Sequence, residues 1–248
     1  MAVELEGGCR VSTMNEGTPE VAGNMTIWRQ IGPATGAKAV SLRIIEFSEG
    51  RSQSIHNDEV DEVFYYLESL EEVRQAASQC TVSLEGRDLN LEPQTGFYLQ
   101  SGKTLLVENS SSAPVTFVSV QCPKSANEAA EPSFPGVRLT DRTAIPTADR
   151  WYRVLVDEEV GSNEVTQFVG SIPPGRAPDH FHQYEEVLFI LRGQGRMWAG
   201  QTNTPIEPGS CIYLPRGQVH CVENTGTDEL RLLGVFYPAG SPSVRYEA

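Results

Sequence analysis

The chain has 248 residues, of which 39% are hydrophobic and 21% charged, so it is long enough for one large or two small globular domains. Its 33 acidic and 19 basic side chains give a net charge of −14, which argues against nucleic acid and anionic membrane surfaces as partners, because both are polyanions. No apolar run approaches the roughly 20 residues of a membrane span, and the first residues lack the basic and apolar regions of a secretory signal, so a cytoplasmic protein is expected.

Short runs rich in valine, isoleucine, phenylalanine and tyrosine predict β-strands, the clearest being residues 39–47, 63–67, 115–120, 186–191 and 230–237. Glycine, proline, asparagine and serine separate these runs, and sustained helical periodicity is nearly absent. One helix is predicted at 69–78, where Ser69 and Glu72 have the spacing of a capping box. The pattern favours an all-β sandwich or barrel.

A change of composition divides the chain into two halves. Residues 126–148 are rich in proline and polar side chains and predict a linker between domains at 1–125 and 149–248. The same order of features recurs in both halves, since residues 42–50 match 167–175 and residues 107–109 match 222–224. The sequence therefore predicts an internal duplication of one β unit. Five scattered cysteines without C-x-x-C spacing are expected to be buried thiols.

Three of the four histidines fall in two short segments of the second half. Alternate residues of a strand face the same side of a sheet, which predicts one shared face for four polar side chains: His180, His182, Tyr184 and Glu186. His220 begins a later strand after a Pro-x-Gly turn and supplies a third imidazole. An isolated histidine is most often structural, but this number of convergent donors favours a metal site.

These residues resemble the two sequence motifs of the cupin superfamily. The first motif is matched, with one residue fewer than usual before the first histidine, by Gly175, His180, His182, Glu186 and Gly193. The second motif is matched by Gly209, Pro215, Gly217, His220 and Asn224. With two copies in one chain, the sequence resembles a bicupin. The resemblance implies two tandem double-stranded β-helix (jelly-roll) barrels, and one divalent transition metal ion (Fe, Mn, Ni, Co or Zn) held by His180, His182, Glu186 and His220.

The first copy departs from this pattern. His56 and Glu62 stand at ligand positions, but Asp58 replaces the second histidine and Leu105 takes the place of the last one. We expect the first barrel to be metal-free and structural, with a weak ion site or a ligand pocket as the alternative. The acidic residues between 58 and 62 are expected to form a solvated strand end.

The complete ligand set of the second half favours an enzyme acting on a small oxygenated organic molecule. By resemblance to the many cupins that activate oxygen, a dioxygenase is the leading chemistry. The alternatives are a redox-neutral isomerase or decarboxylase and a non-catalytic small-ligand-binding bicupin; a homodimer stays open. Glu186 is either the fourth ligand or a proton shuttle, and Tyr184 adds a phenol on the same face.

Further residues near the histidines are assigned by strand alternation. Leu188 and Ile190 are expected to form an apolar wall of the site. Arg196 is either a substrate anchor or a solvated edge residue. Glu185 faces away from Glu186 and is assigned to the barrel exterior or to a subunit contact.

Overall fold

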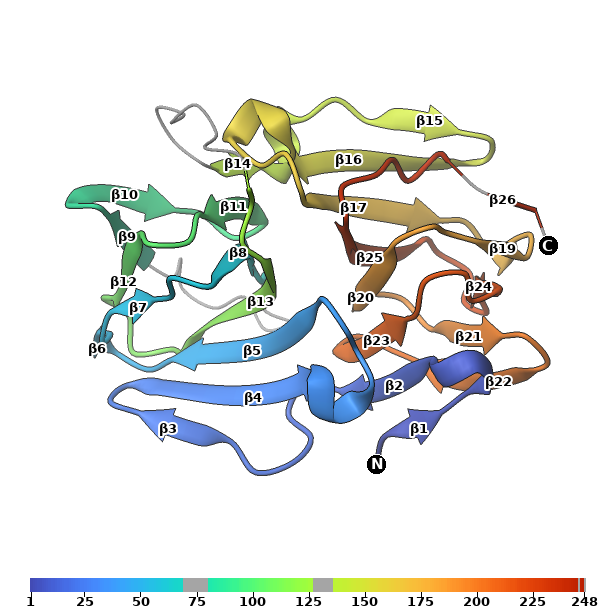
Figure 1. Ribbon diagram of the computed structural model, residues 1–248, viewed down its shortest axis with the longest axis horizontal. Coiled ribbons are helices and arrows are strands. Elements are labelled where there is room, and N and C mark those ends of the chain that lie inside the picture. Colours follow the sequence, from blue (N-terminus) through green and yellow to red (C-terminus); the bar gives the residue numbers. More distant parts are fainter. Residues whose placement is uncertain (69–79, 127–135, 245, 248) are drawn as a thin grey trace.

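The computed structural model describes residues 1–68, 80–126, 136–244 and 246–247, which form two antiparallel β-barrels side by side (Figure 1). The predicted helix at 69–78 lies outside the described residues. Each barrel consists of two sheets, as expected for a pair of double-stranded β-helix domains. The strands predicted from apolar runs are present, and their bounds differ from the prediction by up to three residues.

In the first barrel, the larger sheet has the strand order β14-β11-β8-β13-β5-β4-β3. Its strands are β3 (Glu20–Ala22), β4 (Met25–Ile31), β5 (Ser41–Phe47), β8 (Val60–Tyr66), β11 (Thr95–Leu99), β13 (Val115–Pro123) and β14 (Gly136–Arg138). The facing sheet contains β6 (Gly50–Arg51), β7 (Ile55–His56), β9 (Cys80–Leu84), β10 (Arg87–Leu91) and β12 (Thr104–Asn109).

In the second barrel, the larger sheet has the order β1-β2-β23-β20-β25-β17-β16-β15. Its strands are β1 (Val3–Glu4), β2 (Arg10–Thr13), β15 (Ile145–Thr147), β16 (Arg150–Val156), β17 (Thr166–Ile172), β20 (Glu185–Arg192), β23 (Ser210–Leu214) and β25 (Leu230–Tyr237). The facing sheet contains β18 (Gly175–Arg176), β19 (His180–Phe181), β21 (Gly195–Ala199), β22 (Thr202–Ile206), β24 (His220–Asn224) and β26 (Tyr246–Glu247). Short 3-10 helices lie at η1 (Glu6–Gly8), η2 (Pro33–Thr35), η3 (Leu139–Asp141) and η4 (Glu158–Val160).

Central strands of both barrels are apolar on both faces because each face is covered by a different core. In β20, Leu188 and Ile190 belong to the interior of the second barrel, whereas Val187 and Phe189 belong to a cluster shared by the two barrels. The matching alternation in β8 places Phe64 inside the first barrel. Two barrel interiors and one inter-barrel layer therefore form the core.

Glu185 anchors the inter-barrel layer. Its buried carboxylate accepts hydrogen bonds from the backbone N–H groups of Lys38, Ala39 and Val40, at 3.0, 2.8 and 3.2 Å, and from the hydroxyl of Tyr213 at 2.7 Å. Glu185 lies outside its own barrel, as the alternation predicted, but it contacts the other barrel of the same chain. Carboxylates that accept several backbone N–H bonds are strongly held, so this residue fastens the two halves together.

Two segments are paired differently from the predicted division at 1–125, 126–148 and 149–248. The first strands, β1 and β2, extend the sheet of the second barrel, with Val11 opposite Ile212. The part of the predicted linker that the structure describes contains β14, which pairs with the first barrel, and β15, which pairs with β16 of the second. Proline suggested a linker there, but proline is also tolerated in short edge strands such as β15, which contains Pro146.

All five cysteines are buried and free, as expected from their spacing. Among the described residues, no helix has the length and apolar character needed to cross a membrane.

Candidate metal centre

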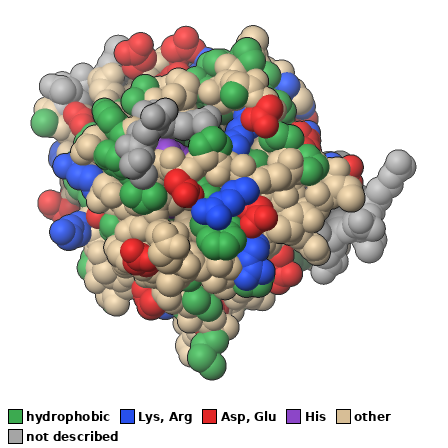
Figure 2. Space-filling view, turned by 90° about the vertical axis from the view of Figure 1, so that its right-hand side faces the viewer, with side chains coloured by type: hydrophobic (Ala, Val, Ile, Leu, Met, Phe, Trp, Pro, Cys, Tyr) green, Lys and Arg blue, Asp and Glu red, His purple; other side chains and the backbone are tan. Residues whose placement is uncertain are grey.

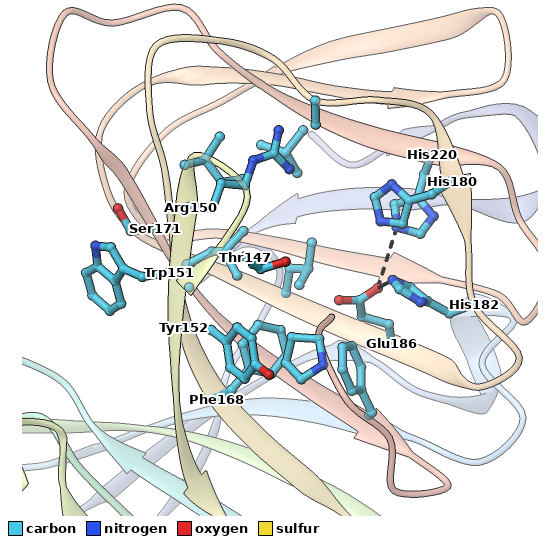
Figure 3. A pocket seen from close by; sticks show the side chains of 18 residues that line it. Thr147, Arg150, Trp151, Tyr152, Phe168, Ser171, His180, His182, Glu186 and His220 are labelled. Carbon is cyan, nitrogen blue, oxygen red and sulfur yellow. Dashed lines mark ion pairs between the residues drawn. The ribbon is translucent and has the colours of Figure 1, made fainter. Parts of the chain in front are cut away.

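The three histidines of the second half meet at one end of the second barrel (Figure 3). His180 on β19 and His220 on β24 are directly opposite each other in the antiparallel pair, and His182 follows β19. Potential ligand nitrogens of the three rings lie within 4.8 Å of one another. The ring centroids are 4.5 Å apart for His180 and His220 and 4.9 Å apart for His180 and His182. The strand pairing thus brings together the imidazoles that the sequence singled out.

Each imidazole has a hydrogen-bond partner that faces Nδ1. The carbonyl of Pro178 lies 3.0 Å from Nδ1 of His180, and the carbonyl of Gln218 lies 2.8 Å from Nδ1 of His220. A carbonyl can only accept, so these two rings donate from Nδ1 and present the lone pair of Nε2. Such outer partners are typical of histidines that ligate metals.

Tyr184 provides the corresponding partner for His182. Its hydroxyl lies 2.9 Å from Nδ1 of His182 and donates to the carbonyl of Ser241 at 3.3 Å. A phenol that donates to Ser241 accepts from His182, which fixes the same tautomer as in the other two rings. The two rings also stack, with centroids 4.7 Å apart. Burial, then the nearby Glu186, raises the pKa of Tyr184, so the phenol stays protonated.

Glu186 completes the cluster from β20. Its Oε2 lies 3.8 Å from Nε2 of His182 and 3.6 Å from Nε2 of His220, and this buried oxygen has no hydrogen-bond partner among the described residues. Burial raises the pKa of Glu186 to about 8, while burial and then the neighbouring His180 lower the pKa of His220 to about 3. A buried carboxylate beside three imidazoles fits a divalent cation, because the cation would compensate the carboxylate charge and accept the nitrogen lone pairs.

The cluster opens into a cavity of about 90 Å³ whose walls are mostly apolar. Leu188, predicted as part of this wall, lines the cavity, whereas Ile190 is packed deeper in the barrel core. Other apolar lining residues are Trp151, Tyr152, Phe168, Ile172, Ala177, Val222, Leu232, Phe236 and Pro242. In the face of the second barrel drawn in Figure 2, only a small patch of histidine is visible, in agreement with the burial of His182 and His220. Apolar cavities with a few convergent polar groups are typical of small-molecule sites.

The arginine weighed as a substrate anchor lies elsewhere. Arg196 donates from Nε to Asn203 at 2.6 Å and lines a different surface hollow. Instead, Arg150 of β16 lines the cavity, together with Thr147 of β15. Sequence reasoning missed Arg150 because it lies at the edge of the presumed linker. Its place two residues before Tyr152, on a strand predicted from Trp151 onwards, was the available signal.

The first barrel has a different arrangement at the corresponding positions. Glu62 is buried and forms an ion pair with Arg43 and a hydrogen bond with Ser119. His56 and Asp58 are exposed and lie 3.4 Å apart at their nearest polar atoms. The predicted donors therefore do not converge, and the guanidinium of Arg43 stands beside the carboxylate that matches Glu186.

The expectation of a solvated acidic strand end was wrong for two of its residues. Asp61 and Glu62 are 1% and 2% exposed. Asp61 accepts from the hydroxyl of Tyr98 at 2.7 Å and from the backbone N–H groups of Ser101 and Ser125. An acidic run is usually exposed, but here tertiary partners far along the chain satisfy both carboxylates.

We expect Arg43→Met to destabilise the protein by about 3–5 kcal/mol, because the substitution leaves the carboxylate of Glu62 buried without its cation. The double variant Arg43→Met, Glu62→Leu should recover most of that loss, since neither charge then remains. Urea unfolding of both variants measures the difference. Equal destabilisation by the single and the double variant would show that the ion pair is not the cause.

Comparisons with known proteins agree with this fold and site. Residues 168–236 match the cupin domain family. An oxalate-binding protein from Thermotoga maritima is 32% identical over 84 residues, which are 33% of this chain and 69% of that protein. Auxin-binding protein 1 from Arabidopsis thaliana is 32% identical over 83 residues, 29% of this chain. The chain matches only 42% of the length of this second relative.

Solved structures resemble the whole two-barrel arrangement. The protein Ylba from E. coli superposes with a TM-score of 0.77 at 14% identity, covering 95% of this chain and 93% of that one. Oxalate decarboxylase from Bacillus subtilis superposes with a TM-score of 0.72 at 13% identity, covering 93% and 78%. The fold and the histidine cluster define a two-barrel protein of the bicupin class. The chain belongs to the cupin superfamily.

Proposed function

We propose that this protein is a metal-dependent enzyme that acts on a small oxygenated organic molecule, and that it is a dioxygenase. One observation carries the proposal: three imidazoles with matching tautomers surround a buried carboxylate oxygen that lacks a partner among the described residues, at the end of an apolar cavity. In this proposal His180, His182, Glu186 and His220 hold one divalent ion. When bound, such an ion supplies a Lewis acid that polarises substrate oxygens.

The side chains around the ligands have separate roles in this proposal. Tyr184 is a positioning residue, because its phenol holds the ring of His182 and does not line the cavity. Leu188 and Phe236 exclude water from the substrate, which strengthens the electrostatic contacts inside. Glu186 either ligates the ion or carries a proton at its carboxylate, a role that its raised pKa allows in the absence of a cation.

A redox-neutral reaction on a small acid is the second candidate. It is supported by the names of two similar proteins, the oxalate-binding relative and the oxalate decarboxylase with the same fold. For the decarboxylase, a title describes Mn(II) centres. A decarboxylase releases CO₂ without net consumption of O₂, whereas a dioxygenase transfers both atoms of O₂ to its substrate, so oxygen uptake separates the two reactions.

The test begins with elemental analysis of the protein purified without chelator. The metal-free protein is then reloaded separately with Fe, Mn, Ni, Co or Zn, and oxygen uptake is measured with catechols, flavonols and 2-oxo acids. One loaded form is expected to consume O₂ in proportion to substrate lost, and the His220→Ala variant serves as the background control. Turnover without oxygen uptake would favour the second candidate. A fully metallated protein that turns over no substrate would contradict an enzymatic role.

A further inference from the structure

We propose that Arg150 binds a carboxylate of the substrate, so that the cavity selects small organic acids over neutral molecules of the same shape. This inference rests on the proposed function, because the other end of the substrate would face an ion held by the histidines. Arg150 is a specificity-determining residue in this proposal and takes no part in holding the metal.

The position of Arg150 is fixed by the hairpin of β15 and β16. Arg150 is directly opposite Thr147 in the antiparallel pair, and both residues line the same cavity as the three histidines. The side chain is only 13% exposed. Figure 3 shows it entering the cavity from β16, on the side opposite Phe168. The hairpin therefore places a guanidinium and the histidine cluster around one small space.

The charge pattern of the cavity favours an anion. A guanidinium stays protonated at any physiological pH, and Arg150 is the one lysine or arginine among the described residues that line this cavity. Its Nε lies 3.5 Å from a carboxylate oxygen of Asp149, but Asp149 is 70% exposed, so water screens this pair. Most of the remaining wall is apolar. In such surroundings a carboxylate that reaches Arg150 meets a weakly screened positive charge.

The shape of the group favours a carboxylate in particular. Guanidinium offers two parallel N–H donors in a planar fork that matches the two oxygens of a carboxylate. A cavity of about 90 Å³ suits a molecule of a few heavy atoms. A short acid with a hydroxyl or oxo group beside its carboxylate combines an anionic end for Arg150 with further oxygens for the ion.

Neighbouring arginines on the same sheet have other contacts. Arg153 donates to the carbonyl of Leu139 at 2.8 Å, and Arg231 pairs with Glu229. Both guanidinium groups lie over the ring of Trp151, 5.3 and 5.6 Å from its centroid. Neither residue lines the cavity, so Arg150 differs from them in position and not in residue type.

The test compares a 2-hydroxy acid with its neutral amide. The full-length protein, loaded with Mn(II), is titrated calorimetrically with glycolate and lactate and, separately, with glycolamide and lactamide. Wild-type protein is expected to prefer the acids. In Arg150→Met the affinity for the acids should fall about 10- to 100-fold, the range for loss of a hydrogen bond to a charged group, while the amides bind as before. Arg150→Lys should retain part of the preference, because it keeps the charge and loses the fork.

Arg196→Met is the matched control, because it removes the same charge from the same barrel outside the cavity. It should bind the acids like the wild type. Thermal unfolding and elemental analysis of every variant show that the comparison is made on folded, metallated protein. If the wild type prefers no acid, or if Arg150→Met keeps the preference with full metal content, Arg150 does not bind a carboxylate. If the wild type takes up no metal, the proposed function fails instead, and the inference that rests on it is withdrawn.

Discussion

Replacing His220 by alanine is expected to reduce bound metal from about one ion per chain to almost none. Loss of an outer partner of a ligating histidine already weakens metal affinity by about 10- to 100-fold, so loss of the ligand itself should cost more. The remaining donors, His180, His182 and Glu186, would also be left around a cavity that the missing ring had filled. Elemental analysis after gel filtration measures the metal content directly.

The first barrel supplies the control for this experiment. His56 occupies the position in the duplication that corresponds to His180, but it is exposed and separate from the buried Glu62. His56→Ala should therefore leave the metal content unchanged. Stoichiometric metal in His220→Ala, or an equal loss in His56→Ala, would mean that other groups hold the ion.

Deleting residues 2–13 is expected to make the protein aggregate, although the deletion removes no proposed ligand. Leu5, Cys9 and Val11 belong to the core of the second barrel, and exposing a buried apolar side chain costs about 1.5–3 kcal/mol. Strand β2 also covers the edge of β23, so the deletion would leave β23 with unpaired N–H and C=O groups at the edge of its sheet. Both effects act on the barrel that contains the histidines.

Solubility after expression, gel filtration and thermal unfolding measure this effect. A Val21→Asp variant is the control for a change near the N-terminus, because Val21 is 69% exposed on β3 of the first barrel. The same reasoning predicts that a fragment of residues 131–248 is insoluble, since it lacks the arm formed by β1 and β2. A soluble, monomeric deletion variant with an unchanged unfolding midpoint would show that the arm is dispensable.

The sequence motifs predicted the histidine cluster because the information is local. His180, His182 and Glu186 are at fixed spacing around one strand, and the turn before His220 places the third ring on the neighbouring strand. The repetition of this pattern was sufficient to predict two barrels.

The features that were not predicted depend on contacts between distant segments. Nothing in residues 1–13 indicates which sheet edge they will join. The acidic run gives no sign that Arg43 will neutralise Glu62, because the pair forms only when β5 and β8 are brought together by β13. Arg150 was missed for a similar reason, since its role depends on a cavity formed by strands from both sheets.

The two adjacent glutamates of β20 make the strand's alignment critical. Glu186 faces the histidines and Glu185 faces the other barrel, so a shift of one residue would exchange them and still present a carboxylate on each side. Charge alone would therefore tolerate the wrong alignment. The N–H groups of residues 38–40 and the hydroxyl of Tyr213 distinguish the two, because they bind the carboxylate of Glu185 at one fixed height along the strand. The barrel without the histidine cluster thereby sets the register of the strand that carries Glu186.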